Sequence, residues 1–395
     1  MKAAGGVSAA AAAQSALAPA GPDAGTAPPI PATAAGTAAA ARTAPVQPSQ
    51  TQQQQSYPTP RTRIYYNPEL SMFSLGEDHP MVPHRLHLTH RLAELWGLFD
   101  DPAVQVVRDY PPATTDQLRR FHTDEYIAFL EYLDTLDLET MSDEDDDDDE
   151  GGDCPIFPGL LRYVGLQAAG SILAARDLAH GLCDVAVHWG GGMHHGMPYR
   201  AFGFCYVNDL VLAILELMAV CGRVLYIGEV EGIFRATNDT LNHGKPQRPV
   251  FFPGTGKKND LGEGTGKYYT VNVPLQDDIT DDSYFHVYKA VVKTAFERFK
   301  PQAVVLQCGC DSVAGDKLGR FNLSIRGHSR QVEWGFGAWR VPLLVTGGGG
   351  YTPPLVARCW TLETAVLLGM QLGEAMPPAV AKAEDLADLG PSYFK

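Results

Sequence analysis

Two adjacent histidines follow a glycine run and are the first candidates for chemistry in this chain. His194 and His195 come directly after the segment Gly-Gly-Gly-Met at residues 190–193. Glycines let a backbone approach a ligand closely, and an imidazole serves either as a general base or as a metal ligand. The pair is therefore a candidate for a general base with its partner, or for two metal ligands. A chance pair on a surface loop is the alternative.

An aspartate and a tyrosine follow two other apolar runs. Asp311 comes after residues 304–307, and a carboxylate at the end of such a strand is a candidate metal ligand or a helix cap. Tyr351 follows four glycines, so its phenol is free to approach one point and to donate a hydrogen bond to a developing oxyanion. A phosphate-binding loop is disfavoured, because Pro353 and Pro354 stand where a lysine and a hydroxyl residue are expected.

The segment at residues 203–209, Gly-Phe-Cys-Tyr-Val-Asn-Asp, combines an aromatic side chain with a helix start. Asn208 and Asp209 are residues that cap helices well. Phe204, beside Gly203, is a candidate wall of a narrow tunnel.

The elements that position these residues alternate between strands and helices. Apolar runs of strand length occupy residues 185–189, 224–227, 269–273, 303–307 and 343–346, and amphipathic segments of helical period occupy residues 160–179, 207–220, 282–299 and 355–368. This alternation predicts an α/β fold in one domain, a mostly parallel central sheet with helices on both faces. Ligands bind such sheets at the carboxyl ends of the strands, where the candidate residues stand.

Composition predicts two regions outside regular structure. Residues 1–61 are rich in Ala, Pro and Gln, and we expect a disordered tail because such a segment cannot bury enough apolar surface to fold. The folded domain is predicted over residues 62–395. Within it, residues 143–150 are eight consecutive acidic residues, which predict a solvated loop. The net charge of −15 suits a basic partner, and equally suits plain solubility.

Several classes of function are disfavoured by composition. No basic face for nucleic acid stands out, and no apolar stretch is long enough to span a membrane. The seven scattered cysteines include no Cys-x-x-Cys pair and are typical of a reducing compartment.

Together these segments resemble the class I histone deacetylases of the arginase/deacetylase superfamily. The matching segments are residues 78–85, 121–127, 153–157, 194–195, 203–209, 252–256, 308–312 and 347–351. The resemblance implies zinc-dependent hydrolysis of N6-acetyl-lysine in histone tails or other proteins, with Zn²⁺ and a structural K⁺ as cofactors. It further implies chromatin regulation in the nucleus, also with a cytoplasmic pool, and a corepressor complex as partner.

The resemblance also assigns roles to individual residues. His195 would be the general base, His194 its electrostatic partner, Tyr351 the oxyanion donor and Asp311 a zinc ligand. The substrate would be bound by four residues: Asp153 at the rim, Gly203 and Phe204 in the lysine tunnel, and Leu318 near its mouth. Arg85 would belong to an inner cavity.

The chain departs from the family after the strand at residues 224–227. The family continues there into Asp-x-Asp-x-His-His-Gly-Asp-Gly, which supplies two of three zinc ligands, whereas this chain reads Gly-Glu-Val-Glu-Gly-Ile-Phe at residues 228–234. Glu229 and Glu231 are conceivable substitutes. Farther on, Asn242 stands at or beside the position of a second tunnel phenylalanine. Two functions therefore remain open: a zinc-dependent lysine deacetylase, and an inactive scaffold or acetyl-lysine-binding protein.

Overall fold

The computed structural model describes residues 60–136, 153–228, 233–237, 259, 261–262 and 264–389. Most of the predicted tail, residues 1–59, lies outside the described residues, as do the acidic run 143–150, Glu229, Glu231 and Asn242. For residues 233–237 only the backbone is described.

Eight strands form one sheet in the order β2-β1-β3-β8-β7-β4-β5-β6. The first six in this order are parallel to one another, and β5 and β6 are antiparallel additions at one edge. The strands are β1 (Thr62–Tyr65), β2 (Val104–Val107), β3 (Val185–His188), β4 (Val224–Ile227), β5 (Ile233–Thr237), β6 (Thr270–Asn272), β7 (Ala303–Gln307) and β8 (Leu343–Thr346). The expected α/β fold with a mostly parallel sheet is confirmed.

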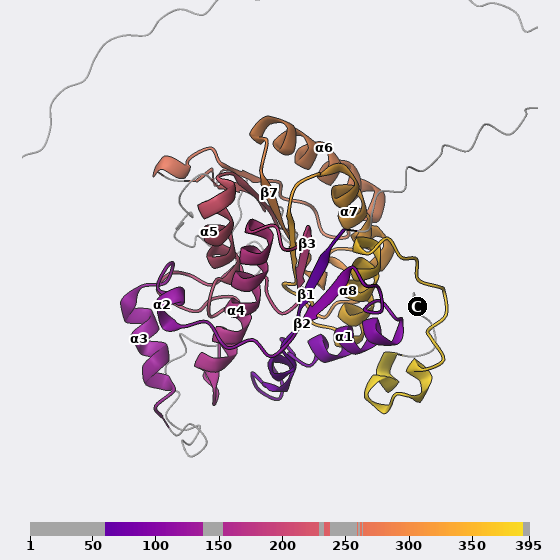
Figure 1. Cartoon of the computed structure of the whole chain (residues 1–395), viewed down its shortest axis with the longest axis horizontal. Coiled ribbons are helices and arrows are strands. Elements are labelled where there is room, and N and C mark those ends of the chain that lie inside the picture. Colours follow the sequence, from indigo (N-terminus) through magenta and orange to yellow (C-terminus); the bar gives the residue numbers. More distant parts are fainter. Residues whose placement is uncertain are drawn as a thin grey trace, which may run out of the picture. The chain divides into compact units, whose positions relative to one another are not determined.

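Helices cover both faces of this sheet, with α4 and α5 on one side and α1, α7 and α8 on the other (Figure 1). The α-helices are α1 (Arg85–Leu95), α2 (Thr115–Leu118), α3 (Asp124–Leu133), α4 (Leu160–Ala179), α5 (Asp209–Cys221), α6 (Asp281–Phe299), α7 (Ile325–Ala338) and α8 (Pro353–Leu367). Short 3₁₀ turns are η1 (Pro68–Met72), η3 (Gly264–Gly266), η4 (Cys310–Ser312), η5 (Val380–Lys382) and η6 (Glu384–Leu389). No helix in the described part of the chain has both the length and the apolar character that a membrane crossing needs.

The central strands are buried along their whole length, which is why they read as continuous apolar runs. Every residue of β3, β4, β7 and β8 is buried, as expected for parallel strands covered on both faces. The strand predictions at 224–227, 303–307 and 343–346 match the observed bounds, and those at 185–189 and 269–273 are longer by one and two residues.

The helix prediction at 160–179 also matches, but that at 207–220 is wrong at its start. The helix begins at Asp209 because Asn208 is its N-cap, whose side-chain oxygen accepts a hydrogen bond from the Val211 amide (3.1 Å). A first short strand is expected from the sequence at residues 64–66 and is observed as β1, two residues earlier at its start and one at its end. The sequence did not predict the helices α1, α2, α3 and α7 or the strands β2 and β5.

Helix α4 packs directly against β3 at Gly170. A Cβ at this position would overlap the imidazole ring of His188, which is fully buried in β3. We expect Gly170→Ala to lower the free energy of unfolding by about 1–3 kcal/mol, the usual cost of forcing an atom into a packed core. Urea unfolding measures it.

Gly337 provides the matched control, because it is an exposed glycine of α7 with open space where a Cβ would stand. Gly337→Ala should stabilise the protein by about 0.5–1 kcal/mol through helix propensity alone. Equal effects of the two substitutions would contradict the close crossing of α4 and β3.

Candidate active site

A cavity of about 350 Å³ opens where the parallel strands end. Seven residues singled out in the sequence line it: His194, His195, Gly203, Phe204, Asp311, Leu318 and Tyr351. The other lining residues are Pro80, Met81, Gly192, Met193, Cys205, Gln307, Arg320, Gly348 and Gly349. The structure therefore brings the predicted histidine pair, carboxylate and phenol into one cavity.

These residues converge because β3, β8 and β7 are neighbours and end level with one another. His188 pairs with Thr346, and Gln307 pairs with the same threonine from the other side. The loops after the three strands carry the histidine pair, Tyr351 and Asp311. The carboxyl ends of adjacent parallel strands thus deliver all four side chains to one edge of the sheet.

Glycines make this convergence possible at two points. A Cβ on Gly192, which has a φ of 99°, would overlap the backbone of Gly347 in the neighbouring loop. A Cβ on Gly349 would overlap the carboxylate of Asp311. The glycine runs are therefore required for close packing of the loops that line the cavity.

Two residues at the start of α5 hold the loop at residues 189–195, which carries the histidine pair and is called the histidine loop below. Asp209 is fully buried, and its carboxylate accepts hydrogen bonds from the amides of Gly192 (3.0 Å) and Met193 (2.7 Å) and from the Ser171 hydroxyl (2.5 Å). Burial raises the pKa of Asp209, and these hydrogen bonds oppose that rise. Asn208 donates to the carbonyl oxygen of His194 (3.0 Å). Capping, the simpler interpretation of the two residues, is confirmed for Asn208, but both also support the histidine loop.

The two histidine rings lie side by side, with centroids 3.9 Å apart. Nδ1 of His194 lies 3.3 Å from the hydroxyl of Tyr226, which donates to Gln307 at the same distance. Gln307 in turn donates to the carbonyl oxygen of Gly192 (2.9 Å). The sequence analysis did not identify Tyr226 or Gln307 as residues of the site. Gln307 could have been noticed, because it is a polar residue at the end of an otherwise apolar strand.

Tyr351 faces Phe204 across the cavity, with ring centroids 5.6 Å apart in an edge-to-face arrangement. The Tyr351 amide donates to the carboxylate of Asp316 (2.6 Å), which fixes the backbone at that point. Burial, followed by the negative charge of Asp311, raises the pKa of Tyr351 well above its usual value. A protonated phenol at this position can donate a hydrogen bond into the cavity.

Three further predicted residues surround the cavity. Leu318 lines it with 41% of its surface exposed, as expected near a mouth. Asp153 is not a lining residue; its carboxylate accepts a hydrogen bond from the Gly203 amide (2.8 Å) and so supports the tunnel wall. Arg85 is buried behind the glycine loop and donates to the carbonyl oxygens of Gly350 (2.5 Å) and Gly348 (2.6 Å).

The described cavity residues do not fit a catalytic zinc held by three protein ligands. Such sites use three His, Asp, Glu or Cys side chains whose ligand atoms surround one point. Within the described part of the chain, the one cluster with this property is Cys310, His328 and Cys359, and none of the three lines the cavity. Asp311 is in place, but Glu229 and Glu231 lie outside the described residues.

Comparison with known proteins decides the family. The chain matches the histone deacetylase domain over residues 79–367. It belongs to the histone deacetylase family. It is 44% identical to "Histone deacetylase 19" of Arabidopsis thaliana over 339 residues. This match covers 83% of this chain and 66% of the Arabidopsis protein.

This histone deacetylase family member is also similar to proteins from human and rice. Human "Histone deacetylase 1" is 42% identical over 320 residues, covering 79% of this chain and 66% of the human protein. "Histone deacetylase 2" of Oryza sativa subsp. japonica is 45% identical over 327 residues, covering 80% and 63% respectively. The chain thus spans slightly less than two thirds of the length of these relatives.

The contacts of Asp209 predict a large effect of a small substitution. Asp209→Asn replaces one acceptor oxygen by an NH₂ group that faces backbone amides. We expect the free energy of unfolding to fall by about 1–3 kcal/mol, because buried donors lose their acceptor. Urea unfolding measures this loss.

Asp116→Asn, at an exposed aspartate of α2, is the control and should change the free energy of unfolding by no more than about 0.5 kcal/mol. An Asp209→Asn protein as stable as wild type would contradict this role.

Proposed function

We propose that the gene product acts on N6-acetyl-lysine in histone tails or other acetylated proteins, as a zinc-dependent lysine deacetylase in chromatin regulation in the nucleus, and that the chain as given binds acetyl-lysine without hydrolysing it. The observation that carries the proposal is the convergence of His194, His195, Asp311 and Tyr351 in one cavity of a histone deacetylase family member. The names of the relatives support the same reaction.

The cavity has the character that an acetyl-lysine side chain requires. Phe204 and Leu318 provide apolar contact for the lysine methylenes, and the polar groups lie among the strand ends. In the proposed reaction Tyr351 donates a hydrogen bond to the acetyl oxygen, where negative charge develops. His195 accepts the proton of the attacking water, and His194 stabilises the charged ring beside it.

A second function is binding of acetyl-lysine without hydrolysis, and one observation favours it for this chain. Among the described residues, Asp311 is the one cavity residue to which the family resemblance assigns zinc. One carboxylate does not hold zinc usefully, since catalytic zinc takes three protein ligands. Hydrolysis therefore needs two more ligands from the segment that follows β4.

The partners and cofactors follow the same proposal. Acetylated histone tails suit the acidic chain, whose net charge is −15. A corepressor complex, a structural K⁺ and a cytoplasmic pool stay predictions. Binding to nucleic acid or membrane is not expected.

For the chain as given, we expect binding of acetylated peptide without turnover. Its zinc content should be the same in the wild type and in Asp311→Asn, because the cavity does not hold the ion. A fluorescent acetyl-lysine peptide should bind more tightly than its unacetylated control. Tyr351→Phe should weaken that binding about fivefold, the loss of one hydrogen bond of roughly 1 kcal/mol. Anisotropy, metal analysis and a deacetylation assay are the measurements.

Two results would change this expectation. Stoichiometric zinc that disappears in Asp311→Asn, together with peptide hydrolysis, would make this chain an active deacetylase with ligands from the segment after β4. Equal affinity for acetylated and unacetylated peptide would contradict both functions. A transcript with an in-frame Asp-x-Asp-x-His stretch after the Ile227 codon would support deacetylation by the gene product.

A further inference from the structure

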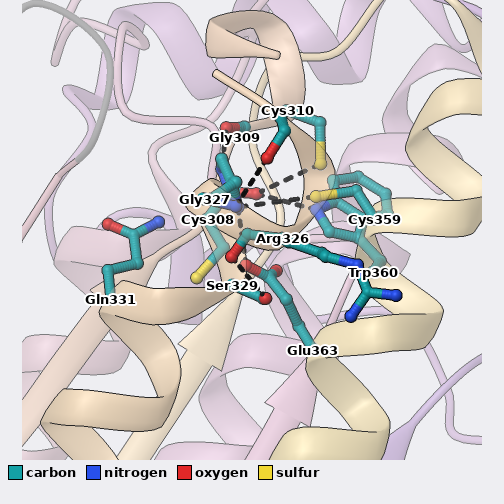
Figure 2. A network of polar contacts seen from close by, with 12 residues as sticks. Cys308, Gly309, Cys310, Arg326, Gly327, Ser329, Gln331, Cys359, Trp360 and Glu363 are labelled. Atoms are coloured by element: carbon teal, nitrogen blue, oxygen red, sulfur yellow. Dashed lines mark hydrogen bonds and ion pairs between the residues drawn. The ribbon is translucent and has the colours of Figure 1, made fainter. Parts of the chain in front are cut away.

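A second cluster of metal-binding side chains lies in the core, outside the cavity. Ligand atoms of Cys310, His328 and Cys359 lie within 4.8 Å of one another, and all three side chains are fully buried. They come from η4, α7 and α8 respectively. Glu363, one turn after Cys359 on α8, is also fully buried, and its Oε1 lies 2.6 Å from Nδ1 of His328. Figure 2 shows Cys310, Cys359 and Glu363 arranged around this space.

The hydrogen bonds of His328 orient the ring for metal binding. Nε2 of His328 lies 2.9 Å from the carbonyl oxygen of Gly309, and a carbonyl accepts only, so Nε2 carries the proton. Nδ1 lies 3.4 Å from Cys359 Sγ, and its 2.6 Å contact with the Glu363 carboxylate requires that the two atoms share a proton, which a metal ion would displace. Metal-bound histidines characteristically donate their other ring N–H to a carbonyl or carboxylate. The ring is thus held as it would be in a metal site.

We propose that Cys310, His328 and Cys359 bind a zinc ion in the core of this protein. Glu363 contacts His328 but lies outside the group of ligand atoms within 4.8 Å of one another, so its carboxylate would move toward the two sulfurs to become the fourth ligand. Zinc prefers tetrahedral sets of sulfur, nitrogen and carboxylate ligands at about 2.0–2.3 Å, which places the ligand atoms roughly 3.4–3.8 Å apart. The 3.4 Å between Nδ1 and Cys359 Sγ agrees with this spacing. The contact between Nδ1 and Glu363 lengthens as the ion replaces the shared proton. Sulfur and nitrogen ligands disfavour Mg²⁺ and Ca²⁺.

The surroundings offer charge compensation for such a site. Two thiolates and a carboxylate around Zn²⁺ leave one net negative charge. The buried guanidinium of Arg85 is close to Cys310, because Arg85 Nη1 and Cys310 Cβ lie 3.4 Å and 3.1 Å from the point where a Cβ on Gly350 would stand. A positive charge at this place in the core stabilises an anionic cluster, because buried charges interact strongly where water is excluded.

The proposed zinc site would be structural. It would influence the cavity because η4 and α8, two of the elements that it joins, lie next to cavity residues in the chain. Cys310 directly precedes Asp311, and α8 begins two residues after Tyr351. A zinc ion bound to η4, α7 and α8 would therefore fix the segments that carry two cavity residues. With Glu363 as the fourth ligand, every ligand would be a protein side chain, as in structural rather than catalytic zinc sites.

Cobalt substitution in the reduced, full-length protein tests the proposal. Titration of the metal-free protein with Co²⁺ should end at one ion per chain, with tetrahedral visible bands and a thiolate charge-transfer band. Cys310→Ala and Cys359→Ala should each weaken Co²⁺ binding by more than roughly tenfold and lose charge-transfer intensity. Cys308→Ala is the matched control: Cys308 is equally buried, two residues from Cys310, and not in the cluster, so it should keep the spectrum. Circular dichroism confirms that each variant is folded.

Asp311→Asn separates this site from the cavity, and the spectrum should persist in it. No thiolate–cobalt band in the wild type would overturn the proposal, as would a band that Asp311→Asn removes or that Cys310→Ala leaves unchanged. A Cys310–Cys359 disulfide that persists under the reducing conditions of the titration, found by mass spectrometry, would also overturn it. None of these results depends on deacetylation.

Discussion

The close approach of three glycine-containing loops at the carboxyl ends of β3, β8 and β7 is the constraint on which the cavity depends. Backbone lies against backbone at Gly192 and Gly347, and backbone lies against the Asp311 carboxylate at Gly349. Side chains at Gly192 or Gly349 would force the loops apart and separate the histidine pair from Asp311 and Tyr351. The buried parallel strands hold the loops at this distance, because their ends are level across the sheet.

This arrangement places backbone polar groups in the core, and buried polar side chains satisfy them. Asp209 accepts from two amides of the histidine loop, Gln307 donates to its Gly192 carbonyl, and Arg85 donates to two carbonyls of the tyrosine loop. Each such group would cost free energy if it were buried without a partner. The polar residues around the cavity therefore support its shape as well as its chemistry.

Two groups of side chains lie close to one another in the fold. The cavity contains the histidine pair, the Tyr351 phenol and the Asp311 carboxylate, whereas the core cluster contains two thiols and an imidazole, with the Glu363 carboxylate against the imidazole. Under the proposed function, zinc ligands supplied after β4 would make the difference between hydrolysis and binding alone. Strand β4 is parallel to its neighbour β7, so its carboxyl end lies at the same edge of the sheet as Asp311.

The sequence by itself determined the fold class, the central strands and the histidine pair, carboxylate and phenol of the cavity, because buried parallel strands are long apolar runs and glycine loops mark their ends. It did not indicate α1 or α7. Helix α1 buries Arg85, Thr89 and His90, so its pattern is not amphipathic, and α7 contains three glycines. Only the tertiary structure decided that Tyr226 reaches His194 and that Cys310, His328 and Cys359 meet. Those partners are far apart in the chain, and no periodicity encodes a contact that arises only when separate elements pack together.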